Sequence, residues 1–232
     1  MSESTTTKIP PTPIILHHLN NSRSQRILWL LEELNLNYEV KKYQRGSDML
    51  APAELKEVHP LGKSPIITDG PHTLAESGAI IEYLVNRYGD GKMKPTNGSD
   101  EQLQYTYWLH FAEGTLMFPL LMTLIFMEVT KQTPFFVRPI ASAISSQVHK
   151  LFIDPNLQRD FKYIESHLEK NEWFAGPEIS GADIQMSFPL EAASMRADKF
   201  IGPKTKAWIK MIQDRPAYKR ALEKGGEYSM NF

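Results

Sequence analysis

The sequence predicts an α+β domain followed by an all-helical domain. From residue 14 to residue 88, short segments with the length and pattern of strands alternate with segments of helical periodicity. Residues 89–100 are rich in Gly, Lys, Pro, Asn and Ser, as linkers are. After this stretch the apolar residues recur at helical spacing only. We therefore expect a mixed domain at residues 14–88, a linker at residues 89–100 and a helical domain at residues 101–232.

The elements of the first domain come in the order strand, helix, strand, then strand, strand, helix. Ile14 and Ile15 begin an apolar segment that is too short for a helix and is β-branched, which favours a strand. Asp69-Gly70 is a turn pair suited to a hairpin. Strands are expected at residues 14–16, 38–43, 66–68 and 72–74, and helices around residues 27–34, 53–58 and 76–88. With a proline at the entrance to the third strand, this order is that of a thioredoxin-like domain.

Prolines and small polar residues mark the ends of the helices expected in the second domain. Pro119 should bend or end a long helix that starts near Glu101. Asp154-Pro155 should cap and open a further helix, and Ser180 with Asp183 has the spacing of a capping box. Gly225-Gly226 should end the last helix.

The junction between the first strand and the first helix, residues 17–26, is crowded with small polar side chains. Ser22 and Gln25 have the spacing of a capping box, so we expect Ser22 to cap this helix. The free N–H groups and the positive dipole end of the helix favour a bound anion, a thiolate included. This stretch alone leaves two interpretations of Ser22: a helix cap only, or a residue that also contacts an anion.

Composition excludes several classes of function. The formal net charge of -1 gives no basic field of the kind that nucleic-acid binding requires. The chain has no cysteine, hence no disulfide, no thiolate metal site and no cysteine nucleophile, and we expect no metal. Residues 1–13 resemble a disordered tail rather than a secretory signal, and no run approaches the roughly twenty apolar residues of a membrane span. A cytoplasmic protein is therefore expected.

Four motifs, in this order along the chain, resemble those of the cytosolic glutathione transferases. They are the loop Lys63-Ser64-Pro65-Ile66, the segment from Leu74 to Ile81 with its Glu76-Ser77 pair, the box from Ser180 to Ile184, and the closing stretch from Trp208 to Leu222. The resemblance covers the chain from Ile14 to about Gly226. The sequence of residues 17–34 most resembles that of the fungal and bacterial branch that includes the yeast-type, serine-containing transferases.

The resemblance implies the glutathione transferase fold and a bound glutathione, used as co-substrate. It implies a cis peptide bond before Pro65 and a Ser64 backbone that pairs with an extended peptide as an added strand. The Glu76-Ser77 pair would hold the γ-glutamyl end of glutathione, since a carboxylate, a hydroxyl and free amides suit an ammonium and a carboxylate. The alternative for this pair is a second helix cap. Lys63 would reach the glycine carboxylate, or is only an exposed loop lysine.

Ser22 is the candidate catalytic residue because it would face the sulfur of glutathione. A free thiol has a pKa near 8.5, and lowering it by about two units requires roughly 2.7 kcal/mol. A hydroxyl hydrogen bond to a charged acceptor supplies about 1.5–3 kcal/mol, and a helix N-terminus about 0.3–1 kcal/mol more. Together these two effects are large enough to lower the thiol pKa by about two units. Asn20, Asn21, Ser24 and a backbone amide are alternative donors.

Apolar residues of the long helix in the second domain are candidates for the electrophile site. Tyr107, Phe111 and Phe118 would line a cleft between the domains with Met117 beside them, although each also suits the core. We expect a homodimeric enzyme that joins glutathione to small hydrophobic electrophiles, with a glutathione-dependent peroxidase side activity. The alternative is a catalytically weak glutathione-binding or protein-interaction module. The absence of cysteine excludes a thiol oxidoreductase.

Overall fold

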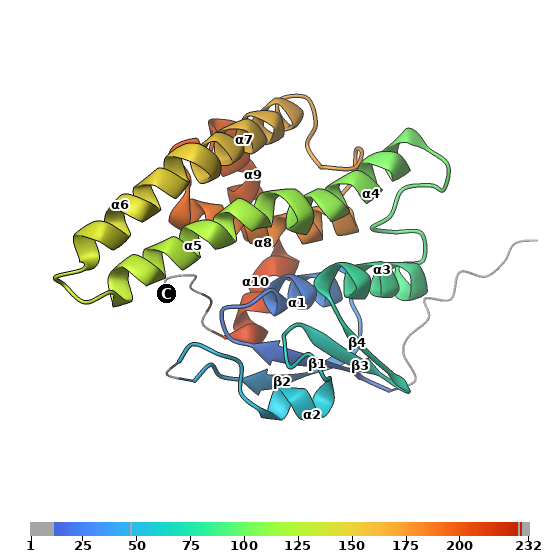
Figure 1. Ribbon diagram of the computed structural model, residues 1–232. Helices are drawn as coiled ribbons and strands as arrows, with labels where there is room; N and C mark the ends of the chain where they lie inside the picture. Colours follow the sequence, from blue (N-terminus) through green and yellow to red (C-terminus); the bar gives the residue numbers. More distant parts are fainter. Residues whose placement is uncertain (1–11, 47, 227, 229–232) are drawn as a thin grey trace, which may run out of the picture.

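A computed structural model describes residues 12–46, 48–226 and 228, so the tail expected at residues 1–13 lies outside the described residues except for its last two. A four-stranded sheet with its helices is followed by a helical bundle (Figure 1). The sheet part contains β1 (Ile14–Leu19), α1 (Ser24–Glu33), β2 (Tyr38–Tyr43), α2 (Glu54–Val58), β3 (Ile66–Asp69), β4 (His72–Ala75) and α3 (Ser77–Tyr88). The helical part contains α4 (Asp100–Phe111), α5 (Met117–Gln132), α6 (Arg138–Val148), α7 (Asp154–Leu168), α8 (Gly181–Arg196), α9 (Pro203–Asp214) and α10 (Pro216–Gly225).

The sheet has the strand order β2-β1-β3-β4. β1 and β2 are parallel and are joined by α1, whereas β3 is antiparallel to both β1 and β4. The helices α1 and α3 lie on one face of the sheet, and α2 lies on the other (Figure 1). This arrangement confirms the predicted thioredoxin-like topology and the all-helical second part.

β1 is longer than the sequence pattern predicted. The apolar run ends at Leu16, but the strand continues to Leu19, and His17 and His18 pair with Lys41 and Lys42 of β2. Both histidines are buried. The prediction stopped too early because a polar side chain in a strand is read as a boundary, whereas here the two imidazoles are accommodated on opposite faces of the sheet.

Pro119 does not end the long helix, so of the two predicted effects, a bend or an end, the second is wrong. α4, a π-helical segment at Ala112–Leu116 and α5 follow one another without a break. Pro119 is the third residue of α5, directly after the π-helical segment, and the helix continues through it although proline offers no N–H to the helical ladder. By length and composition alone the combined helix, Asp100–Gln132, is long and apolar enough to cross a membrane. Core helices pass the same test, and this one buries Trp108 and Leu116 inside the protein.

Asp154 does not cap a helix either. The helix is continuous from α6 through a π-helical segment at His149–Ile153 into α7. The backbone amides that follow Asp154 therefore already have partners within the helix. The Asp154 carboxylate instead contacts His149, at 2.9 Å, and Lys199, at 2.7 Å. The capping box of Ser180 and Asp183 is confirmed, and Gly226 with a φ of 95° follows the last helix as expected.

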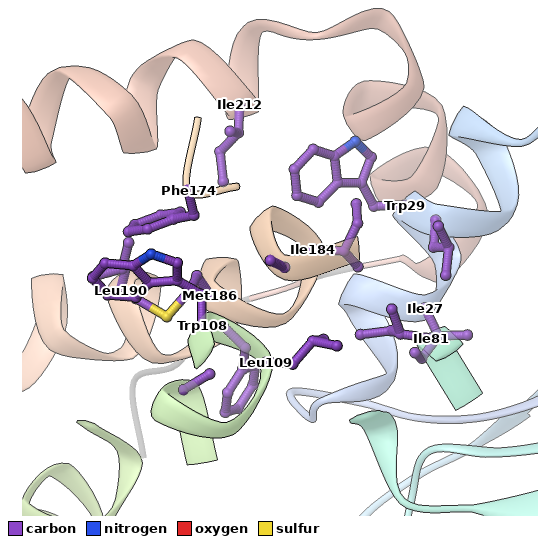
Figure 2. Close-up of a cluster of buried hydrophobic side chains, with 14 of the residues drawn as sticks. Ile27, Trp29, Ile81, Trp108, Leu109, Phe174, Ile184, Met186, Leu190 and Ile212 are labelled. Carbon is purple, nitrogen blue, oxygen red and sulfur yellow. The ribbon is translucent and has the colours of Figure 1, made fainter. Parts of the chain in front are cut away.

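The apolar core is continuous between the sheet part and the helical part. Figure 2 shows Ile27 and Trp29 of α1 with Ile81 of α3 in one cluster with Leu109 of α4 and Ile184 of α8. All five side chains are buried. The start of α1 is therefore held by both parts of the molecule.

Candidate active site

One end of the sheet collects most of the predicted site residues. β1 ends at Leu19, the antiparallel β3 begins at Ile66, and β4 ends at Ala75. Ile66 pairs with His17 on one side and with Ala75 on the other. The residues just before Ile66 therefore lie between the end of β1 and the start of α3.

Ser64 sits at the centre of this end of the sheet. Its peptide bond to Pro65 is cis. The Ser64 hydroxyl donates to the carbonyl oxygen of His17 at 3.0 Å and accepts the N–H of Leu19 at 3.2 Å. These two bonds fix the Ser64 side chain to the last residues of β1, and no backbone hydrogen bond of Ser64 occurs within residues 12–46, 48–226 and 228.

Ser22 lies beside Ser64 but does not form the predicted capping box. α1 begins at Ser24, with Arg23 at the N-cap position, and the Gln25 side chain makes no hydrogen bond within the described residues. The buried Ser22 hydroxyl accepts the N–H of Ser24 at 3.2 Å and lies 3.4 Å from the Ser64 hydroxyl, to which it donates. The helix starts one residue later than a cap at Ser22 implies, so Gln25 is the second helical residue and not the third, which the box requires.

Ser24 and His18 extend this group of hydroxyls into the protein. The Oγ atoms of Ser22 and Ser24 are 2.8 Å apart, and Ser24 Oγ is also 2.8 Å from Nδ1 of His18. Burial, with a smaller effect of Lys42, lowers the pKa of His18 to about 4, so its imidazole is neutral at pH 7. The sequence interpretation gave His18 no role. Successive side chains of a strand point to opposite faces of the sheet, so His17 and His18 had to lie on different faces. This alternation could have indicated that His18 points toward α1.

Asn20 and Asn21 have structural contacts with the loop that follows β2. The Asn20 side-chain oxygen accepts the N–H of Arg45 at 2.9 Å, and the Asn21 carbonyl oxygen accepts from the Arg45 guanidinium at 3.5 Å. Asn21 has a φ of 50°, a left-handed conformation that asparagine tolerates better than most residues. Of the two, only Asn21 lines the cavity next to Ser22.

A partly buried ion-pair network holds the first turn of α1 against the helical part. Glu113, in the π-helical segment after α4, accepts three hydrogen bonds from Arg23, of 2.9, 2.9 and 3.1 Å, and one from Arg26, of 2.5 Å. Both guanidinium groups lie over the ring of Phe188, at 5.1 and 5.0 Å from its centroid. Burial alone would raise the pKa of Glu113, but Arg26 and Arg23 outweigh it and hold that pKa at about 2. Sequence reasoning missed this network.

Glu76 and Ser77 occupy the start of α3, as predicted. Glu76 is exposed and has a φ of 72°, which is unusual for a residue with a side chain and is typical of strained functional positions. Ser77 is buried as the first residue of the helix. Lys63 is exposed in the loop before Ser64, and Pro65 is buried.

A cavity of about 720 Å³ opens beside this end of the sheet. Ser22 and Ser64 line it together with Arg23 and Arg45, so polar groups lie on the sheet side. Side chains of the long helix and of α8 form the opposite wall, which includes Met117, Leu121, Leu124 and Phe188. The cavity thus brings hydroxyls and cations next to an apolar surface.

Tyr107, Phe111 and Phe118 do not line this cavity, contrary to the prediction for the electrophile site. Tyr107 and Phe111 line a separate cavity of about 760 Å³ with Tyr163, and Phe118 is exposed and contacts Phe152. The continuous helix explains the difference, because the π-helical segment shifts the face that the residues before and after it present. Within the described residues there is no group of three or more His, Asp or Glu side chains that could hold a metal ion.

Comparison with known proteins gives consistent matches. Residues 12–86 match the protein family "Glutathione S-transferase, N-terminal domain", and residues 131–216 match "Glutathione S-transferase, C-terminal domain". Glutathione S-transferase 3 of Schizosaccharomyces pombe is 40% identical over 218 residues, 91% of this chain and 87% of the relative. Glutathione S-transferase 1 of Saccharomyces cerevisiae is 34% identical over 233 residues, 95% of this chain and 99% of the relative. A solved glutathione S-transferase from Actinobacillus pleuropneumoniae has a TM-score of 0.74 at 33% identity, with 94% of each chain covered.

Proposed function

Because the chain belongs to the glutathione S-transferase family, we propose that it joins the sulfur of glutathione to small hydrophobic electrophiles in the cavity beside Ser22. Family membership confirms the expected fold and enzyme class. The observation that carries the proposed site is the pair of adjacent hydroxyls, Ser22 and Ser64, in a cavity whose far wall includes an apolar patch of Met117, Leu121, Leu124 and Phe188.

Ser22 activates the sulfur in this proposal. On the cavity side its hydroxyl has only a long contact of 3.4 Å to Ser64, so a thiolate in the cavity offers the hydroxyl proton a stronger, charged acceptor. The N-terminus of α1 adds the positive end of its dipole at the same place. No general base is needed, since the thiol proton passes to water once the thiolate is stabilised. Asn21 remains an alternative donor because it lines the same cavity, whereas Asn20 does not line it.

Glutathione lies across the end of the sheet in the proposed complex. The Ser64 backbone pairs with the extended peptide next to Pro65, and Lys63 neutralises the glycine carboxylate. The exposed Glu76 carboxylate binds the α-ammonium of the γ-glutamyl group, and Ser77 with the first amides of α3 binds its α-carboxylate. The register that places these residues beside one another supports this assignment.

The electrophile occupies the part of the cavity formed by the long helix and α8. Leu121 and Leu124 supply apolar surface, Met117 adapts to different shapes, and Phe188 offers a flat ring. This proposal replaces Tyr107, Phe111 and Phe118 with residues that share a cavity with Ser22.

Two assays test the function. We expect conjugation of glutathione to a chlorinated nitrobenzene and a slower, glutathione-dependent reduction of cumene hydroperoxide, because both reactions use the same thiolate. Retention on a glutathione resin without either activity would instead favour the glutathione-binding or protein-interaction module. The hydroxyl group at residue 22 and its open cavity favour the enzyme.

We further propose that the protein is a cytoplasmic homodimer. Within each subunit, residues 89–100 link the sheet domain to the helical domain. The end of α3 at Tyr88 and the start of α4 at Asp100 support the linker. Leu103 and Tyr107 are exposed on α4, outside the cavity of Ser22, and supply apolar surface for a second subunit. Light scattering should give twice the chain mass of 26.6 kDa, and a monomeric mass would refute the dimer.

A further inference from the structure

The chain of side chains behind Ser22 decides whether the Ser22 hydroxyl can donate to a thiolate. A hydroxyl has one proton, and Ser22, Ser24 and His18 are joined by two contacts of 2.8 Å. In each contact one atom donates and the other accepts. The direction of the bond at the His18 end therefore constrains every bond up to Ser22.

One direction of these hydrogen bonds prevents Ser22 from donating to a ligand. If Nδ1 of His18 carries no proton, Ser24 must donate its only proton to it. The contact of 2.8 Å between the two hydroxyls then requires Ser22 to donate to Ser24. The Ser22 proton points into the protein in that case, and none is left for the sulfur of a ligand.

The opposite direction of these hydrogen bonds leaves the Ser22 proton available to a ligand. If Nδ1 carries the proton, it donates to Ser24, whose own proton is then available to Ser22 Oγ at 2.8 Å, a closer acceptor than the Leu19 carbonyl oxygen at 3.3 Å. Ser22 then accepts from Ser24, and its proton points to the cavity side, where Ser64 is 3.4 Å away. Ser64 does not compete, because its proton is donated to the His17 carbonyl oxygen.

The surroundings of the second ring nitrogen favour the proton on Nδ1. Nε2 of His18 faces the end of α10, where a Cβ built on Gly225 would lie 3.4 Å from it. Lys42 Nζ lies at the same helix end, 3.7 Å from the corresponding point on Gly226, and it shares with His18 the lining of a cavity of about 250 Å³. An ammonium group on the Nε2 side repels a proton there and can donate to a bare nitrogen.

The Gln25 side-chain oxygen is the one acceptor near this point among the described residues, 2.8 Å from the Cβ built on Gly225, and it would favour a proton on Nε2. It makes no hydrogen bond with His18 or with any other described residue, so it does not hold a proton there. Burial keeps the pKa of the imidazole low, so His18 carries a single proton at neutral pH and only one of the two directions is present at a time.

We propose that His18 is a positioning residue, which donates from Nδ1 to Ser24 and thereby turns the Ser22 hydroxyl proton toward the sulfur of glutathione. His18 touches no substrate in this proposal and acts through two hydroxyls. The proposal rests on the proposed function, since it presupposes a thiolate beside Ser22.

Nitrogen NMR tests the tautomer directly in the unmodified protein. With ¹⁵N-labelled histidine, the two ring nitrogens of His18 give different shifts according to which one is protonated. The signals that vanish in His18→Asn assign them. We expect the proton on Nδ1 at pH 7. A proton on Nε2 would overturn the proposal without bearing on whether the protein is a transferase.

The pKa of the thiol of bound glutathione tests the consequence, by ultraviolet titration of the thiolate. His18→Leu should raise it by about one unit, a tenfold change, because the hydroxyl chain loses its donor. His18→Asn should restore the wild-type value, since its amide nitrogen occupies the place of Nδ1. His17→Leu is the matched control: it removes a buried histidine of the same strand whose bonds lead to Tyr43 and Thr68, and it should leave the thiol pKa unchanged.

The outcomes separate the two proposals. A lowered thiol pKa in the wild type that His18→Leu leaves unchanged would overturn the role of His18 and keep that of Ser22. An ordinary thiol pKa in the wild type would contradict the proposed function itself. A His18→Leu protein that does not fold leaves the tautomer measurement as the decisive test.

Discussion

Glu113 Oε1 lies 2.5 Å from Nη2 of Arg26, and this contact joins the long helix of the helical part to the first turn of α1. Arg26 is fully buried and also donates to the main-chain and side-chain oxygens of Gln185, at 2.6 and 2.9 Å. Arg23, next to Ser22, binds the same carboxylate. The position of the proposed catalytic serine therefore depends on Glu113, which lies 90 positions beyond Arg23 in the sequence.

Glu113→Gln should destabilise the protein by about 3–5 kcal/mol, because it leaves the buried Arg26 without a counter-charge. Urea unfolding monitored by tryptophan fluorescence measures this loss. Asp214→Asn is the control, since Asp214 pairs with the exposed Lys210 and should change stability by less than about 1 kcal/mol. Equal effects of the two substitutions would contradict the account.

The same ion pair has a defined pH dependence. The folded pKa of Glu113 is about 2, below the ordinary value of 4.5, so its contribution is fully present above pH 4.5 and is lost as the pH falls toward 2. The stability difference between the wild type and Glu113→Gln should shrink through that range. A difference that stays constant down to the acid limit of folding would argue against a charged Glu113.

His18 should make folding sensitive to pH in a higher range. Its folded pKa is about 4, below the ordinary 6.5, because of burial and, to a smaller extent, Lys42. Between these values the unfolded chain binds a proton that the folded protein does not, so stability falls as the pH decreases from 6.5 to 4, by up to about 3 kcal/mol. His18→Asn should lose this part of the slope. His17 and His167 have lowered pKa values too, but they contribute equally to both proteins. Parallel stability curves for the two proteins would contradict the assignment.

Ser77→Ala should weaken glutathione binding without slowing the chemical step. Loss of one hydrogen bond to the charged α-carboxylate corresponds to about 1.5 kcal/mol, a rise in KM for glutathione of roughly tenfold at unchanged kcat. Steady-state kinetics with varied glutathione measures both. Thr73→Ala, an equally small change at an exposed position of β4, should leave this KM unaltered. A fall in kcat with unchanged KM would place Ser77 elsewhere in the mechanism.

Leu121→Gln should raise KM for an apolar electrophile several-fold and leave KM for glutathione unchanged, because Leu121 forms part of the apolar wall of the cavity. Ile125, one turn further along α5, is similarly exposed but does not line the cavity, so Ile125→Gln is the matched control. If both substitutions act alike, the electrophile binds outside this cavity.

Local sequence patterns predicted those features that depend on neighbouring residues. Alternation placed β2 at residues 38–43 without error, and the spacing of Ser180 and Asp183 identified a true capping box. The Glu76-Ser77 helix start was also found, because strand, polar pair and helical periodicity follow one another directly in the sequence.

Features that depend on distant residues escaped prediction. Asp154 has the local pattern of a cap, but the preceding chain is already helical and the carboxylate serves Lys199 instead. Glu113 and Arg26 are ordinary surface residues by type and meet only in the fold. Tyr107 was assigned to the electrophile site from its place on the long helix, yet the π-helical segment separates its face from that of Leu121.

The pKa of the thiol of bound glutathione, compared between the wild type, Ser22→Ala and Ser22→Thr, tests the central claim most directly. The account predicts a value about two units below 8.5 in the wild type, a rise of one unit or more in Ser22→Ala, and a largely retained shift in Ser22→Thr, which keeps the hydroxyl. The same lowered value in all three proteins would contradict a role for the Ser22 hydroxyl in stabilising the thiolate.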